Sequence, residues 1–410
     1  MLTNNRTEDI EVWENAKNMG LEMFKSSGTV KNTLENFMTV LKYDETLQSL
    51  IYNTLNNRFE LNGVQLSTGD KVAVEAYIQS KYGLYNDQMF KKALNWYALQ
   101  KSYNPIKKEI EAVEWDGTER CEAFLSKWLK CPADAYHKEV SRLIFAGGIN
   151  RLYDPGCKFD TTVVLIGNQG CGKSSICQWL AIKEEYYGEV CAFGYGRETL
   201  EMLQGIFIGE AAELLALKKT KEQAQVKSFL TRQVDRGRLA YQETPTDQPR
   251  QCIFIATSNE YQFVSDPTGG RRWLPVRVEA NGHDLYEHKK EVQAYILQCW
   301  AEALAKYKKH QMPCVAKYEL YDEILRHQAS VVEEDYRVGM IDRYIHDREQ
   351  VCVIEVWKRA LDNPYDKPTR KDSNDIAAIL RNLGWDTNRS ARFNEYGVQK
   401  AWEPIGKLPF

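Results

Sequence analysis

The sequence predicts an α/β protein in which a mostly parallel sheet follows a helical region and precedes a small C-terminal module. Three short apolar runs with β-branched residues lie mid-chain, at 163–166, 206–208 and 253–256. Such runs are typical of strands buried on both faces of a parallel sheet. Helical stretches such as Glu222 to Arg232 lie between them. This alternation predicts helices covering both faces of the sheet.

The N-terminal region is predicted to be helical. Two apolar stripes recur there at helical spacing, Leu34, Phe37, Met38 and Leu41 in the first and Phe90, Ala93, Leu94 and Tyr97 in the second. Residues at i, i+3, i+4 and i+7 share one helix face. We therefore expect both stripes to face a hydrophobic core.

The length of 410 residues is too great for one ordinary core. We expect four parts, a helical N-terminal region at 1–110, an α/β core at 111–300, a helical connector at 301–349 and a C-terminal module at 350–410. In the module, Val351 to Ile354 is a candidate strand and Ile376 to Leu380 a candidate helix. Gly384 stands where a helix C-cap would fall. These features predict a winged-helix-like fold for the module.

Composition restricts the compartment and the partners. The net charge of −3 gives no overall nucleic-acid signature, so any contact with DNA must be local. No apolar run approaches the length of about 18 residues that a membrane helix needs. The N-terminus has no signal-peptide pattern, and none of the ten cysteines forms a C-x-x-C pair. We expect a cytoplasmic protein with reduced thiols and no membrane contact.

A phosphate-binding loop is the strongest motif in the sequence. The pattern G-x-x-x-x-G-K-[ST] is matched by Gly167, Asn168, Gln169, Gly170, Cys171, Gly172, Lys173 and Ser174, and Ser175 follows. The loop lies between a predicted strand and a predicted helix, as such a loop requires. Its backbone N–H groups, the helix N-terminus and the Lys173 ammonium suit phosphate oxygens, and the Ser174 hydroxyl suits Mg²⁺. No guanine motif is present, so we expect ATP and Mg²⁺ as cofactors.

Two acidic residues follow the second apolar run. If that strand neighbours the one before the loop, Glu210 and Glu213 can hold Mg²⁺ and polarise the attacking water. Glu210 is nearer the strand end, so we prefer it as the catalytic acid and as a metal ligand beside Ser174. Glu213 could share the task. Alternatively, both are acids in the first turn of a helix, stabilised by its dipole.

A polar amide and two arginines follow the third apolar run. Asn259 can orient water or the γ-phosphate, although an asparagine after a strand is also a common turn former. Arg271 and Arg272 lie on a Gly-rich loop and can stabilise transition-state charge in their own subunit or in a neighbour. We prefer Arg272. The alternative is a surface loop that makes ion pairs.

The order of these motifs resembles that of the virulence-associated protein E family. The resemblance covers about residues 114 to 345 and includes G-N-Q-G-C-G-K-S, I-G-E-A-A-E, K-S-F-L-T-R-Q-V-D-R-G-R-L-A-Y, T-S-N-E and D-P-T-G-G-R-R-W. Trp115 to Gly117 with Arg120, and Pro155 to Asp160, look like its upstream signatures. The family occurs on phages and genomic islands and is related to superfamily 3 helicases of the AAA+ class.

The resemblance implies roles for individual residues. Lys173 and Ser174 would form Walker A, Glu210 and Glu213 Walker B, Asn259 sensor 1, and Arg271 or Arg272 the arginine finger. A hairpin at about 239–251 would touch DNA in a ring pore, preceded by Lys227, Arg236 and Arg238. The sequence departs from the helicase pattern because Gly209-Glu210 stands where Asp-Glu is more usual. The chain also has no room for a fused primase, so a separate primase or replication protein is implied.

These observations favour an ATP-dependent DNA helicase or translocase that supports replication of a phage or genomic island. The resemblance implies a homo-oligomeric ring, such as a hexamer, acting on single-stranded or forked DNA. One alternative is an oligomeric switch or loader that does not unwind DNA. A second is a small-molecule P-loop kinase, which would leave the tandem arginines and the C-terminal module unexplained.

The C-terminal module carries candidate DNA contacts. Arg370, Lys371, Arg389 and Arg392 are interleaved with aromatic residues. We expect these four residues to gather on one face of a winged helix and to contact phosphates, which makes binding salt-dependent. The alternative is an ordinary small domain with a solvated surface, because acidic residues are nearly as numerous there.

Overall fold

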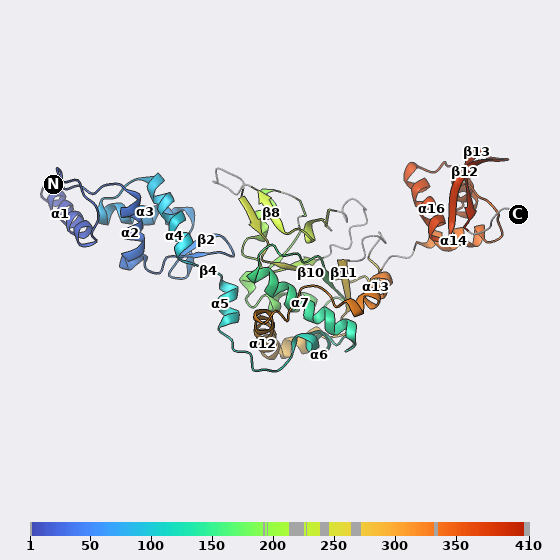
Figure 1. The fold of residues 1–410 in the computed structure, drawn as a ribbon, viewed down its shortest axis with the longest axis horizontal. Helices are drawn as coiled ribbons and strands as arrows, with labels where there is room; N and C mark the ends of the chain where they lie inside the picture. The colour runs from blue at the N-terminus through green and yellow to red at the C-terminus, as the bar shows by residue number, and fades with distance from the viewer. Residues whose placement is uncertain are drawn as a thin grey trace. The chain divides into compact units, whose positions relative to one another are not determined.

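The structure is a computed structural model that describes residues 2–191, 193–194, 196–212, 225–226, 228–237, 246–263, 272–331 and 335–405. The chain divides into two compact units, Met1–Val331 and Val332–Phe410 (Figure 1). Each unit is described by itself.

The larger unit is built on a five-stranded sheet with the strand order β11-β5-β10-β7-β6. The strands are β5 (Thr162–Ile166), β6 (Tyr187–Glu189), β7 (Ile208–Ala212), β10 (Ile253–Ser258) and β11 (Trp273–Arg277). All neighbouring strands are parallel. Every residue of β5 and β10 is buried, as expected for the central strands of a covered parallel sheet. The predicted α/β fold with a parallel sheet is confirmed.

Two long helices, α7 (Ala135–Tyr153) and α12 (Lys289–Lys308), pack together against this sheet (Figure 1). A Cβ at Gly148 of α7 would lie 2.5 Å from the Trp300 ring of α12, so only glycine allows this close packing. Trp300 is fully buried, and its indole N–H donates to the Leu180 carbonyl at 3.1 Å. The other α-helices among the described residues of this part are α5 (Pro105–Glu111), α6 (Phe124–Leu129), α8 (Lys173–Leu180), α9 (Arg197–Leu203), α11 (Gly282–Glu287) and α13 (Tyr321–Ser330).

The N-terminal region has a hydrophobic core of its own. Its helices are α1 (Leu2–Asn18), α2 (Leu34–Tyr43), α3 (Thr68–Tyr82) and α4 (Asp87–Gln100). As expected, Phe37 and Leu41 of α2 and Phe90 and Tyr97 of α4 are buried.

The same region also contains a four-stranded sheet, which the prediction of a helical region did not include. The strand order is β3-β2-β1-β4, with β1 (Ile51–Asn53), β2 (Arg58–Leu61), β3 (Val64–Gln65) and β4 (Ser102–Tyr103). Strands of two to four residues are too short to give a readable alternation of apolar and polar positions. The Gln251 side chain links this region to the core, because it accepts from Asn104 at 2.7 Å and donates to the Thr54 carbonyl at 2.9 Å.

The observed boundaries differ from the four-part division of the sequence. α12 runs across the expected boundary at residue 300. The expected connector at 301–349 is divided, because α13 lies in the larger unit and α14 (Tyr336–Ile345) in the smaller one. The C-terminal unit therefore begins earlier than residue 350.

The C-terminal unit combines helices with one β-hairpin. It contains α14, α15 (Val353–Glu355), the π-helix η7 (Val356–Ala360), α16 (Arg370–Asn382), β12 (Trp385–Phe393) and β13 (Gly397–Pro404). The strands are antiparallel and pack on α16. The expected strand at 351–354 is wrong, because only Val351 makes a β-bridge, to Trp402, and a helix begins at Val353. Gly384 follows the C-cap of α16 with φ of +80°, as its expected C-terminal position requires.

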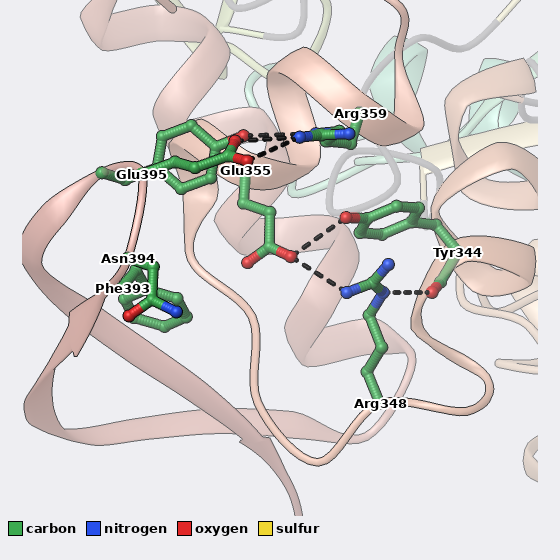
Figure 2. A pocket seen from close by; sticks show the side chains of 8 residues that line it. Tyr344, Arg348, Glu355, Arg359, Phe393, Asn394 and Glu395 are labelled. Atoms are coloured by element: carbon green, nitrogen blue, oxygen red, sulfur yellow. Dashed lines mark hydrogen bonds and ion pairs between the residues drawn. The ribbon is translucent and has the colours of Figure 1, made fainter.

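A cavity of about 380 Å³ lies in this unit beside the hairpin turn (Figure 2). Glu355 accepts from the Tyr344 hydroxyl at 3.0 Å and from Arg348 at 3.1 Å. Arg359 pairs with Glu395 through two hydrogen bonds of 2.9 Å. Burial and the bond to Glu355 raise the pKa of Tyr344 to about 12. Since a carboxylate balances each arginine, this cavity has no excess positive charge.

Two further expectations from the sequence concern the cysteine thiols and membrane-spanning helices. All ten cysteines lie in the described residues and are free thiols. In the part of the chain that the structure describes, no helix combines the length and the apolar character needed to cross a membrane.

Candidate nucleotide site at the glycine-rich loop

The glycine-rich loop connects β5 to α8, which begins at Lys173. Gly170 and Gly172 adopt φ of +81° and +91°, in the left-handed region that favours glycine. The Gly167 N–H donates to the Ser258 carbonyl at 3.1 Å, which ties the loop to the end of β10. A Cβ at Gly167 would come within 2.9 Å of the Val278 carbonyl oxygen. The loop is therefore tightly packed and needs its glycines.

Lys173 lies beneath this loop and is largely buried. Its ammonium donates to the carbonyls of Gly167 at 2.7 Å and Asn168 at 2.9 Å, and to Asn259 Oδ1 at 3.0 Å. A lysine ammonium has three protons, so each has an acceptor. The predicted amide at the end of β10 thus contacts the predicted phosphate-binding lysine.

Glu210 is the buried acid of the site, with no exposed side-chain surface. Its Oε1 accepts from the Ser174 and Thr257 hydroxyls, both at 2.8 Å, and its Oε2 accepts from the Tyr187 hydroxyl at 2.6 Å. Burying a carboxylate is costly unless it is hydrogen-bonded, and three donors satisfy this requirement. Ser174 and Glu210, the two expected metal ligands, are therefore in direct contact.

The position of Glu210 in the sheet differs from the prediction in two ways. β10 lies between β5 and β7, so the acidic strand is not adjacent to the strand that precedes the loop. β7 also continues to Ala212, and Glu210 is inside the strand, opposite Ile255 of β10. The site forms nonetheless, because Ser174 of α8 and Thr257 of the intervening strand both donate to Glu210.

Packing explains why position 209 is glycine rather than the more usual acid. A Cβ at Gly209 would lie 2.7 Å from the Phe254 ring and 3.1 Å from a Val190 methyl group. Phe254 is buried in β10, so it has little room to move. An aspartate therefore does not fit at 209 in this packing, and Glu210 is the acid that β7 supplies to the site.

The same elements line one cavity of about 920 Å³. Its walls come from the glycine-rich loop, the start of α8, β7, the end of β10 and α11. The lining residues among the predicted set are Gln169, Gly170, Gly172, Lys173, Ser174, Ser175, Glu210 and Asn259. This volume lies within the usual range for ligand sites, about 300–1,000 Å³.

Burial and the charge of Glu210 affect two neighbouring groups. Burial raises the pKa of Tyr187, and its hydrogen bond to Glu210 raises it further. Burial likewise raises the pKa of the Cys177 thiol, with a smaller effect from the Glu210 charge. The Tyr187 hydroxyl therefore stays protonated and remains a donor to Glu210 throughout the neutral range.

The structure does not describe every predicted site residue. Glu213, Lys227, Arg238 and Arg271 fall outside the described residues. Arg272 directly precedes β11, an outer strand of the sheet, and is half-buried. Arg236 lies on β8 (Val234–Gly237), and its side chain is 3.4 Å from Asp247 on β9 (Thr246–Pro249).

β8 and β9 form an antiparallel hairpin between β7 and β10 in the chain. The expected hairpin at 239–251 thus begins earlier, at Val234. Its base is fixed by a buried ion pair, in which Arg250 donates to Asp235 at 2.5 and 2.9 Å. Arg250 also donates to the Phe229 carbonyl.

The two upstream signatures have structural contacts. Arg120 forms a bidentate ion pair with Asp116, in which each hydrogen bond is 2.6 Å long. The backbone N–H groups of Arg120 and Cys121 donate to Glu302 of α12 at 2.5 and 2.9 Å. Gly156, with φ of +83°, packs against Pro249 at the base of the β8–β9 hairpin. The first segment is therefore attached to α12, and the second packs against the base of the β8–β9 hairpin.

Sequence reasoning missed several residues of this site. Thr257 lies on β10, two positions before Asn259, so the alternation of side chains along a strand could have predicted its place in the site. Tyr187 carries no local signal, because only the pairing of β6 with β7 brings it to Glu210. The cavity residues of α11 were also missed, and they are Gly282, His283, Tyr286 and Glu287.

Comparison with known proteins identifies the family. The virulence-associated protein E-like domain matches residues 110–335, more than half of the chain. Among solved structures, the A form apo structure of the NrS-1 C-terminal region has a TM-score of 0.45 and 13% identity, covering 87% of this chain and 96% of that one. A further apo structure of the same region has a TM-score of 0.43 and 13% identity, covering 86% and 95%.

A comparison with curated proteins gave no significant match. The domain match contains every described element of the candidate site, from the glycine-rich loop to α11. The resemblance noted in the sequence is thus confirmed, and the chain belongs to the virulence-associated protein E-like family.

Proposed function

We propose that this protein is an ATPase of the helicase or translocase type that acts on DNA during replication of a phage or genomic island. The observation that carries the proposal is the meeting of Lys173, Asn259 and the Ser174–Glu210 pair around one cavity. These groups come from a glycine-rich loop and from two strands that are distant in sequence. Together they provide donors for phosphate oxygens and an acid for water activation.

The donor set fits ATP with Mg²⁺. Hydroxyl and carboxylate oxygens are ligands that Mg²⁺ prefers, and Ser174 and Glu210 bring one of each to the same point. The ion would neutralise charge on the phosphates. Lys173 is placed to hold phosphate oxygens, Asn259 to orient the reacting groups and Glu210 to polarise the attacking water. The arginine finger, which stabilises charge in the transition state, would be Arg271 or Arg272. We propose that a neighbouring subunit of a ring supplies it.

Tyr187 is proposed to position Glu210 for this chemistry. Replacing Tyr187 by phenylalanine removes one of three donors to the carboxylate, and we expect ATP hydrolysis to fall by about tenfold or less. Steady-state ATPase rates of the full chain measure the effect. Tyr186→Phe is the control, because this neighbouring tyrosine has no hydrogen bond to Glu210. Equal rates for Tyr187→Phe and the wild type would show that the hydroxyl has no part in positioning.

DNA contact is proposed for the β8–β9 hairpin. The hairpin carries Arg236, whose side chain is exposed. Residues 250–252 alone connect β9 to β10, and Asn259 directly follows β10. Nucleotide turnover and hairpin position would therefore be coupled through this short link. Lys227 and Arg238 are proposed as further contacts, and a separate primase or replication protein as a partner.

An ATPase assay with and without single-stranded DNA tests the proposal, beside a measurement of particle size. We expect DNA to stimulate hydrolysis severalfold and the active species to be an oligomer. Turnover that ignores DNA but responds to a small-molecule acceptor would favour a kinase. Stimulation by DNA without strand displacement on a forked substrate would favour a switch or loader. Absence of any hydrolysis with Mg²⁺ would contradict the proposal.

We propose that the C-terminal unit binds DNA. The residues proposed for this contact differ from the four expected from the sequence. Arg370 and Lys371 are exposed at the start of α16, and Arg392 is exposed on β12. Arg389 is instead paired with Glu403. Arg389 and Arg392 also point to opposite faces of the hairpin, because strand side chains alternate. All four therefore cannot share one face, and Arg392 shares its face with Lys400, which pairs opposite Ser390.

Removing the C-terminal unit should weaken DNA binding. We expect a chain that ends at Val331 to keep its basal ATPase, because the site elements all precede that residue. Its affinity for duplex DNA should fall. The slope of the logarithm of the binding constant against the logarithm of the salt concentration should become shallower by about 0.9 for each phosphate that the protein no longer neutralises. A binding titration at several salt concentrations measures both. A double Arg370→Ala, Lys371→Ala variant should show part of the effect, and Arg389→Ala little. An unchanged salt slope in the truncation would assign the unit another role.

A further inference from the structure

α11 is a six-residue helix that forms one wall of the cavity at the glycine-rich loop. None of its residues belongs to a phosphate-binding motif. Yet three of its side chains line the cavity, and they come from His283, Tyr286 and Glu287. The wall therefore offers an aromatic ring and polar groups beside the loop.

The position of α11 against the loop is fixed by close packing. A Cβ at Gly282 would lie 2.0 Å from the Gly170 carbonyl oxygen, and a Cβ at Gly172 would lie 2.5 Å from a Leu285 methyl group. Leu285 is buried, and Asn281 caps the helix by accepting from the His283 N–H at 3.0 Å. This packing fixes the distance between α11 and the glycine-rich loop.

Tyr286 is the exposed aromatic residue on this wall, with 60% of its surface accessible. Its ring meets the Trp179 ring edge-to-face with the centroids 5.8 Å apart. Trp179 is buried in α8, the helix that begins with Lys173 and Ser174. The Lys289 ammonium lies 5.7 Å from the centre of the Tyr286 ring. The Tyr286 side chain is thus anchored by its contacts with Trp179 and Lys289, while much of its surface remains open to solvent.

We propose that Tyr286 stacks on the base of the nucleotide whose phosphates the glycine-rich loop holds. The inference rests on the proposed function and adds the base-binding wall to it. An exposed aromatic ring is otherwise unfavourable in water, whereas stacking on a purine would cover it. Stacking recognises any base through its π-face, so selection among bases would come from polar neighbours such as His283 and Glu287.

The test separates base recognition from phosphate binding by comparing two probes. ATP carries a base and a triphosphate, while inorganic tripolyphosphate carries the phosphates alone. Calorimetric titration of the full chain with each probe, at constant Mg²⁺, gives the two affinities. We expect Tyr286→Ala to weaken ATP binding by about 5- to 150-fold and to leave tripolyphosphate binding unchanged. Tyr286→Phe should bind ATP as the wild type does, because the ring is kept.

The control is Glu291→Gln on α12, since Glu291 is exposed and does not line the cavity, and it should bind both probes as the wild type does. Equal ATP affinity for Tyr286→Ala and the wild type overturns the inference. Equal losses for ATP and tripolyphosphate overturn it too, because Tyr286 would then act through the loop. If the wild-type protein binds neither probe, the proposed nucleotide site itself fails. If it binds tripolyphosphate as tightly as ATP, the phosphate site stands and the base site fails.

Discussion

Replacement of Lys173 by alanine is expected to lower ATP hydrolysis at least about a hundredfold, the usual cost of losing one preorganised electrostatic group. The loop carbonyls and Asn259 hold the ammonium at the cavity, where it would exchange one of these acceptors for a phosphate oxygen when ATP binds. Alanine removes the charge and leaves the backbone of α8 unchanged. Steady-state ATPase rates measure the effect, and circular dichroism follows the fold.

The matched control for this change is Lys183→Ala. Lys183 is exposed, pairs with Glu109 at 2.7 Å and does not line the cavity. It should keep full turnover, because exposed ion pairs contribute little to stability or to a distant site. Normal turnover in Lys173→Ala, with an unchanged circular dichroism spectrum, would remove the phosphate-binding assignment.

Glu210→Gln should separate ATP binding from ATP cleavage. Glutamine has the shape of glutamate and keeps an oxygen acceptor for the Ser174 and Thr257 hydroxyls, but it carries no charge to polarise water. We expect ATP affinity to stay within several-fold of the wild type and hydrolysis to fall by about 10²- to 10⁴-fold. Titration with ATP and single-turnover assays measure the two quantities.

Glu189→Gln is the control, because Glu189 is exposed and stands directly opposite Glu210 on the neighbouring β6. It should hydrolyse ATP normally. Glu213→Gln tests the other acid of the same segment. If Glu213→Gln is inactive while Glu210→Gln is active, the two acids exchange their proposed roles and Glu210 becomes a structural acceptor for hydroxyls.

The central strands could be predicted from the sequence where the buried residues are large and apolar. The run at 163–166 lies in β5 and the run at 253–256 in β10. The run at 206–208 overlaps β7 only at Ile208, because Gly209, Ala211 and Ala212 are small and do not extend the apolar signal. The strand was therefore predicted too early, and Glu210 was placed after its end.

The site could be predicted only where local motifs define it. The glycine-rich loop, Glu210 and Asn259 each follow a recognisable apolar run, and the structure brings all three to one cavity. The strand order could not be read, since it depends on which strands pair across distant parts of the chain. Tyr187 and Tyr286 were missed for the same reason, because pairing and helix packing rather than sequence spacing bring them to the site.

The buried Arg250–Asp235 pair has a mechanical consequence. Only three residues, 250–252, separate β9 from β10, and the pair clamps that short link to β8. A force applied to the paired strands β8 and β9 would act directly on this link. It would pull on β10 along its length and arrive at Asn259, whose amide oxygen holds the Lys173 ammonium. We therefore expect a displacement of the base of the hairpin to be transmitted through β10 to Asn259 and the Lys173 ammonium.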